Sequence, residues 1–89
     1  MNAYLNIESN DPDICGKWKA NEVEEAMIEL EIPIENEWSW LEYVLVHSLQ
    51  DYDYDIDVDA LVKILSSSDS ILINMMHNGI WIHIQYACS

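Results

Sequence analysis

The sequence predicts a single α+β domain, residues 1–89, in which an antiparallel sheet of three or four strands is packed on one side by two or three helices. Two alternating stretches that flank Asn78-Gly79 predict a C-terminal hairpin over 70–86. A further alternating stretch near the start predicts an N-terminal strand or hairpin that joins it. Between these regions, apolar residues recur at helical spacing.

The composition indicates a folded but strongly acidic domain. There are 17 acidic residues against 3 lysines, and the formal net charge is -14. Because 51% of the residues are hydrophobic, the chain is unlike a disordered acidic tail. Self-repulsion opposes compactness, so we expect the charge to serve a purpose. Its sign excludes nucleic acid and anionic membranes as direct partners and leaves basic proteins, cations or solubility.

The cysteine content and the hydropathy pattern bear on the compartment. Cys15 and Cys88 are too far apart in sequence to suggest a metal ligand set or a disulfide framework, so we interpret them as structural thiols of a reducing compartment. The sequence shows neither a signal-peptide pattern nor an apolar run of membrane-spanning length. We therefore expect a cytoplasmic protein, in the host cytoplasm if the gene belongs to a phage.

The N-terminal third predicts a strand, a turn, a second strand and a helix. Residues 2–8 alternate apolar and polar side chains, 9–13 are rich in turn formers, and 14–18 could return as a strand. Asn21, followed by Glu24, resembles a capping box and predicts a helix over 22–30. The outer face of this helix carries Glu22, Glu25 and Glu29 without a lysine among them, which a helix built only for stability would avoid.

A second helix is predicted after Pro33, with Asn36 as its N-cap. Its apolar face contains Leu41, Val44, Leu45 and Leu49, and we assign Trp38 and Trp40 to the core. Glu35 and Glu37 would complement the helix dipole. Glu42 has no such explanation, so it is a candidate for partner binding.

Residues 51–59 place five aspartates at every second position. We predict an extended segment or loop, because such a composition makes a poor helix interior. If it is extended, all five carboxylates project one way at about 6.6–6.8 Å intervals, with Tyr52, Tyr54, Ile56 and Val58 opposite. This arrangement would imitate part of a row of DNA phosphates. The alternative is an ordinary solvated acidic loop.

The C-terminal third predicts a third helix and then the hairpin. Asp57 or Asp59 caps a helix that contains Leu61 and Leu65 and ends at the serines 66–68. The two-residue turn fixes the hairpin register. The expected pairs are Met75 with Ile82, Ile73 with Ile84 and Ile71 with Tyr86 on one face, and Met76 with Trp81, Asn74 with His83 and Leu72 with Gln85 on the other.

The residues do not suggest an enzyme or a cofactor. An EF-hand calcium loop that starts at Asp51 would need glycine and glutamate where Ile56 and Val62 stand. The three histidines, His47, His77 and His83, share no ligand spacing, and no motif places a histidine beside Cys15. We expect neither catalytic nor metal-binding residues, although a calcium-binding or merely solvated structural domain remains an alternative.

The stretch from Tyr4 to Leu30 combines a Tyr-containing strand, an Asn-rich turn, Gly16-Lys17-Trp18 and a Glu-rich helix. It resembles the opening segment of ArdA-type antirestriction proteins over about a third of the chain. Those proteins are roughly twice as long, and residues 51–59 do not follow their pattern. The resemblance implies an acidic DNA mimic that occupies the DNA channel of a restriction enzyme. The composition is also similar to that of small phage inhibitors of CRISPR complexes.

These observations predict an inhibitor that binds the nucleic-acid groove of a basic defence protein, either a restriction enzyme or a CRISPR complex, and blocks access of DNA. An immunity protein or antitoxin that neutralises a basic nuclease is the alternative. A homodimer is compatible with the first function, because a two-fold axis would double the imitated stretch. The expected partner-binding residues are Asp51, Asp53, Asp55, Asp57, Asp59, Glu22, Glu25, Glu29 and Glu42.

Overall fold

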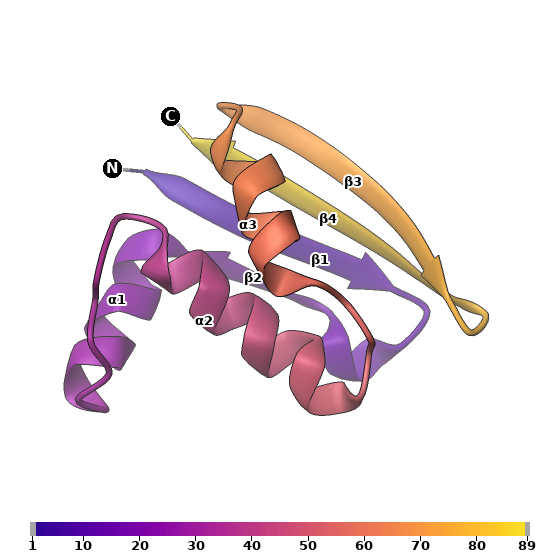
Figure 1. Ribbon diagram of the computed structural model, residues 1–89, viewed down its shortest axis with the longest axis horizontal. Coiled ribbons are helices and arrows are strands. Elements are labelled where there is room, and N and C mark those ends of the chain that lie inside the picture. Colours follow the sequence, from indigo (N-terminus) through magenta and orange to yellow (C-terminus); the bar gives the residue numbers. More distant parts are fainter. Residues whose placement is uncertain (1, 89) are drawn as a thin grey trace.

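The computed structural model describes residues 2–88 and contains one four-stranded antiparallel sheet with helices on one of its faces (Figure 1). This arrangement confirms the predicted α+β class. The strands are β1 (Ala3–Ser9), β2 (Gly16–Lys19), β3 (Ser70–His77) and β4 (Ile80–Cys88). The helices are α1 (Ala20–Glu29), α2 (Ser39–Ser48) and α3 (Val58–Ser66), with two short 3-10 helices, η1 (Pro12–Ile14) and η2 (Gln50–Tyr52).

The sheet order is β2-β1-β4-β3, so the two chain ends contribute its two central strands. All six predicted hairpin pairs are confirmed, because the turn at Asn78-Gly79 has the expected two-residue length. Both turn residues have positive φ, 49° at Asn78 and 80° at Gly79, as a type I′ turn requires. The predicted docking of the N-terminal strand is also confirmed, since β1 pairs with β4 from Ala3 to Ser9.

The first helix starts earlier than predicted, and its proposed cap is wrong. Asn21 lies inside α1, and the N-cap residue is Lys19, whose side chain makes no capping hydrogen bond. The reason is that β2 runs directly into α1, so the extended Lys19 ends the strand and begins the helix at once. As the second residue of α1, Asn21 cannot serve as its N-cap.

The second helix begins later than predicted, at Ser39, with Trp38 as its N-cap residue. Asn36 instead closes a turn before the helix, where its Oδ1 accepts a hydrogen bond from the Trp38 N–H at 2.8 Å. Glu35 and Glu37 therefore precede the helix, and Glu42 occupies its first turn. This reverses the predicted dipole argument, because Glu42 is the residue that the helix N-terminus stabilises.

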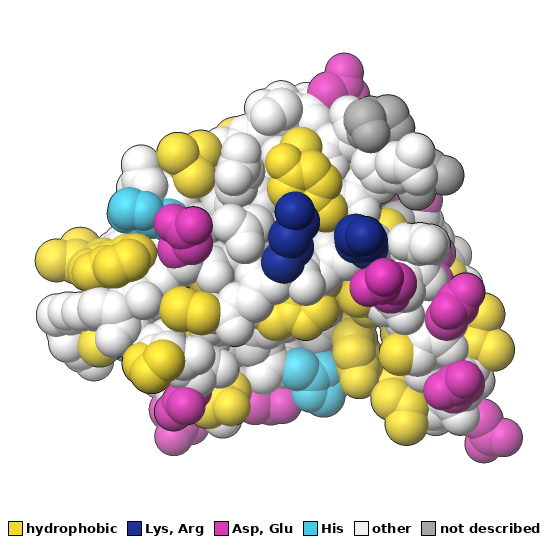
Figure 2. All heavy atoms as spheres, turned by 180° about the vertical axis from the view of Figure 1, so that it is seen from behind, with side chains coloured by type: hydrophobic (Ala, Val, Ile, Leu, Met, Phe, Trp, Pro, Cys, Tyr) yellow, Lys and Arg dark blue, Asp and Glu magenta, His cyan; other side chains and the backbone are white. Residues whose placement is uncertain are grey.

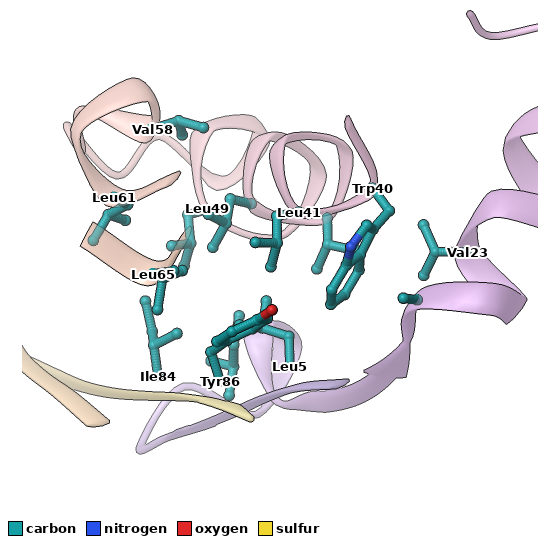
Figure 3. Close-up of a cluster of buried hydrophobic side chains, with 14 of the residues drawn as sticks. Leu5, Val23, Trp40, Leu41, Leu49, Val58, Leu61, Leu65, Ile84 and Tyr86 are labelled. Carbon is teal, nitrogen blue, oxygen red and sulfur yellow. The ribbon is translucent and has the colours of Figure 1, made fainter. Parts of the chain in front are cut away.

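The core fills the space between the inner face of the sheet and the helices (Figure 3). Leu5, Ile84 and Tyr86 rise from the sheet towards α2 and α3. Trp40 is buried as predicted, and its ring centroid lies 6.4 Å from that of Tyr86. Because every described helix packs on this face, the side chains of the opposite sheet face remain outside the core.

Candidate protein-binding surface

The acidic residues are concentrated in the part of the chain that covers the sheet. Residues 20–66, which we call the helix layer, contain thirteen of the seventeen acidic residues and a single lysine, Lys63. All nine carboxylates predicted to bind a partner belong to this layer, and all nine are exposed. The layer is therefore strongly negative on the side that faces solvent.

The opposite side of the sheet, which we call the open face, differs in charge. It is formed by the strand residues that alternate with the core residues, Tyr4, Asn6, Glu8, Lys17, Lys19, Leu72, Asn74, Met76, Trp81, His83 and Gln85. Its one acidic residue is Glu8, and it carries two of the three lysines. Figure 2 shows both lysines near the middle of this side, with most acidic side chains at its margins. The molecule thus has one negative layer and one face that is nearly free of carboxylates.

The five aspartates do not form a straight ruler, and the prediction of equal extended spacing is wrong at both ends. Asp51 lies in η2, whereas Asp59 lies in the first turn of α3. Between them the chain is a loop, which confirms the prediction for the middle of the segment. Asp53 has φ 62°, a left-handed conformation that aspartate tolerates better than most residues. The five carboxylates follow a bent path instead of a line.

Two of these aspartates have local structural roles. The Asp57 Oδ1 accepts a hydrogen bond from the Ala60 N–H at 3.1 Å, which confirms Asp57 as the N-cap of α3. The Asp51 Oδ2 lies 2.9 Å from the Nδ1 of His47, one helical turn earlier. Both side chains of this pair are more than half exposed, at 54% for His47 and 56% for Asp51, so it contributes little to stability. Both carboxylates still face solvent.

Tyr54 holds the aspartate segment against the rest of the protein. Its ring is buried, and its O–H donates a hydrogen bond to the Asp11 Oδ2. On the sheet side, its ring lies edge-on to His77 with 5.8 Å between centroids. The hydrogen bond to Asp11, burial and the charges of Asp11 and Asp13 together raise the pKa of Tyr54 to about 12. One residue of the segment is thus anchored to both η1 and β3.

Tyr52 does not take the buried position that alternation predicted. Its side chain is 49% exposed, because η2 turns it away from the direction that Tyr54 takes. Its neighbours in the chain, Asp51 and Asp53, are both exposed. Strict alternation of buried and exposed residues holds only from Asp53 onwards. The exposed Tyr52 ring therefore lies between two exposed aspartates, a position that the alternating pattern does not predict.

The helical glutamates and the aspartate segment lie at different ends of the helix layer. Glu22, Glu25 and Glu29 project from α1, whereas the aspartates follow the C-terminal end of α2 (Figure 1). Glu22 nevertheless lines the same hollow as His47 of α2, whose imidazole contacts Asp51. Glu42 lies near the N-terminal end of α2.

Possible metal ligands, thiols and helix lengths among the described residues bear on other kinds of function. Within 2–88, no group of three histidine, cysteine or acidic side chains is placed to hold a metal ion. Cys15 and Cys88 are both free thiols. No helix in this part of the chain is long and apolar enough to cross a bilayer.

Comparison of the chain with protein-family models, curated proteins and solved structures found no match. The geometry of the surface itself is therefore the basis for a functional proposal.

Proposed function

We propose that this protein is an inhibitor that imitates DNA and occupies the nucleic-acid groove of a basic defence protein, such as a restriction enzyme or a CRISPR complex. The supporting observation is the separation of charge. Thirteen carboxylates lie in the helix layer with one lysine, whereas the open face has only Glu8. A protein that needed charge for solubility alone would gain as much from an even distribution.

The proposed contacts are those that phosphates make. Exposed carboxylates of residues 51–59 would meet Lys and Arg side chains of the groove, and the glutamates of α1 would meet further basic side chains. The anchor at Tyr54 and the cap at Asp57 limit the movement of the aspartates. Preorganisation of this kind lowers the entropy cost of binding. The opposite charges of the inhibitor and the groove would also accelerate the diffusional encounter of the two proteins.

The test is displacement of a labelled DNA duplex from purified restriction enzymes and CRISPR complexes. The key variant replaces Asp51, Asp53, Asp55, Asp57 and Asp59 by asparagine, which keeps side-chain size and retains a good N-cap residue at 57. The matched control neutralises five carboxylates that are not among the nine proposed contact residues, by Glu8→Gln, Asp13→Asn, Glu24→Gln, Glu31→Gln and Asp69→Asn. Both variants change the net charge equally.

We expect the five-aspartate variant to lose about 10-fold or more in inhibitory strength, and the control to lose much less. Inhibition by the natural sequence should weaken as salt rises, because screening reduces the attraction between exposed charges. Equal losses in the two variants would show that only net charge matters. In that case the proposed surface is wrong.

A second candidate function, an immunity protein or antitoxin for a basic nuclease, is favoured by Tyr52. Such proteins recognise one partner through aromatic anchors, and Tyr52 is 49% exposed within the aspartate segment. Against a nuclease toxin, Tyr52→Ala should then weaken inhibition more than neutralisation of any single aspartate. A DNA mimic predicts the reverse order, because charge would dominate its contacts.

A further inference from the structure

The outer edge of β3 is an unprotected strand edge. Within residues 2–88, β3 lies at the end of the sheet and pairs only with β4. Its sequence, Ser-Ile-Leu-Ile-Asn-Met-Met-His, contains no lysine, carboxylate or proline. Strand edges are usually protected by such residues, because an open edge can pair with another strand.

The hairpin register identifies the backbone groups at this edge. In a two-residue hairpin the residues next to the turn form a hydrogen-bonded pair, here His77 with Ile80, and such pairs alternate along the strands. The even-numbered residues of β3 therefore turn their N–H and C=O groups outwards. Ser70, at the start, is already satisfied on both groups by the Ser68 hydroxyl. Leu72, Asn74 and Met76 remain.

These three residues are symmetric about Asn74, and the geometry points to a second copy of this chain as the partner of the edge. Antiparallel pairing about a two-fold axis at Asn74 would use the outward N–H and C=O groups of all three residues. Leu72 would oppose Met76 of the partner subunit on the open face, and Asn74 would oppose the partner's Asn74. On the other face Ile73 would oppose the partner's Met75. Apolar residues meet apolar residues, and asparagine meets asparagine, at each of these positions.

Large apolar side chains are exposed at this edge, and the proposed pairing would cover them. Met76 is 74% exposed and Leu72 is 58% exposed, although both are large and apolar. On the other side of the edge, Ile64 of α3 is 45% exposed and lines a hollow of about 290 Å³ together with Met75 and Met76. Asp55 and Asp57 also border this hollow. A second β3 strand would cover this hollow as well as the open-face side chains. The helix α1, which carries Glu22, Glu25 and Glu29, lies near β2 at the opposite end of the sheet (Figure 1). Asp55 and Asp57 are the carboxylates beside the edge, and their repulsion contributes to the salt dependence of the pairing.

This inference does not depend on the proposed function, because it concerns the protein alone. Two copies of net charge -14 repel each other, so dimer formation should strengthen as salt rises. Binding to a basic groove should weaken under the same change. The opposite salt responses make the two proposals separable.

The first test is sedimentation equilibrium of the full chain from roughly 1 μM to 1 mM, at low and high salt. We expect the mass to rise with concentration from 10.4 kDa towards twice that value, and to rise further at high salt. A mass of 10.4 kDa throughout would overturn the inference and leave the edge for a strand of another protein.

The register is tested by a charge swap. Leu72→Lys and Met76→Glu should each weaken self-association about 10-fold or more, because each introduces an unpaired charge at the edge. Mixed together, the two variants should form a heterodimer in which Lys at 72 meets Glu at 76. Ile28→Lys, at a position 66% exposed on α1, is the control and should dimerise normally. Failure of the mixture to associate would refute the register.

A backbone variant provides an independent check that needs no added charge. Asn74→Pro removes one outward N–H and leaves the β4 hydrogen bonds in place, since residue 74 does not form a bonded pair with His83. We expect a folded monomer, verified by circular dichroism. Self-association unchanged in this variant would show that any dimer forms elsewhere.

Discussion

The anchor at Tyr54 gives a stability prediction that can be worked out from the structure. Tyr54→Phe retains the buried ring and removes only the O–H that donates to Asp11. Hydrogen bonds to charged groups contribute about 1.5–3 kcal/mol, and the half-buried Asp11 can recover some hydration, so we expect a loss near the lower limit, about 1.5 kcal/mol. For a domain of this size each kcal/mol shifts Tm by about 4–8 °C. The variant should therefore melt about 6–12 °C lower.

Tyr52→Phe is the matched control for this measurement. It makes the same chemical change two residues earlier, at a side chain that is 49% exposed. Exposed substitutions of this kind usually change stability by less than about 0.5 kcal/mol. Thermal melts followed by circular dichroism, with urea unfolding as a second measure, should separate the two variants. If both melt together, Tyr54 is not the anchor of the aspartate segment.

Three further predictions concern capping, ionisation and the core. Asp57→Ala should destabilise the protein by about 1 kcal/mol through loss of the α3 cap, whereas Asp57→Asn should be nearly neutral in urea unfolding. In a spectroscopic tyrosine titration, Tyr54 and the buried Tyr86 should ionise late, because the Asp11 hydrogen bond and burial respectively raise each pKa to about 12. These folded-state pKa values exceed the ordinary value of 10.0, so the two tyrosines should contribute their full stabilisation below pH 10. The stabilisation should be lost between pH 10 and about 12, and chemical denaturation at each pH would measure the loss. Leu45→Ala, at a fully buried position of α2, should cost about 2–5 kcal/mol, whereas Ile28→Ala on the exposed face of α1 should leave the urea midpoint nearly unchanged.

The features predicted correctly from the sequence depend on local rules. Asn78-Gly79 has few alternatives to a two-residue turn, and one such turn determines every pair of the β3–β4 ladder. The alternation of Ala3, Leu5 and Ile7 with polar residues likewise leaves one face to be buried, and all three are buried in β1.

The errors arise where two elements compete for the same residues. Asn21 and Asn36 have the right chemistry for helix caps, but β2 continues directly into α1, and Ser39 closes the turn around Asn36. An extended aspartate segment would alternate throughout, but the 3-10 helix η2 includes Asp51 and Tyr52 and leaves the Tyr52 side chain exposed. The bond between Tyr54 and Asp11 spans 43 positions, and no local pattern in the sequence pairs them.

The proposed function requires that the position of the carboxylates, and not their number, makes the protein an inhibitor. The most direct measurement compares duplex displacement by the five-aspartate variant and by the equally charged control at one fixed low salt concentration. We predict that the control displaces DNA nearly as well as the natural sequence, and that the variant of residues 51–59 does not. Equal activity of the two proteins would contradict the account.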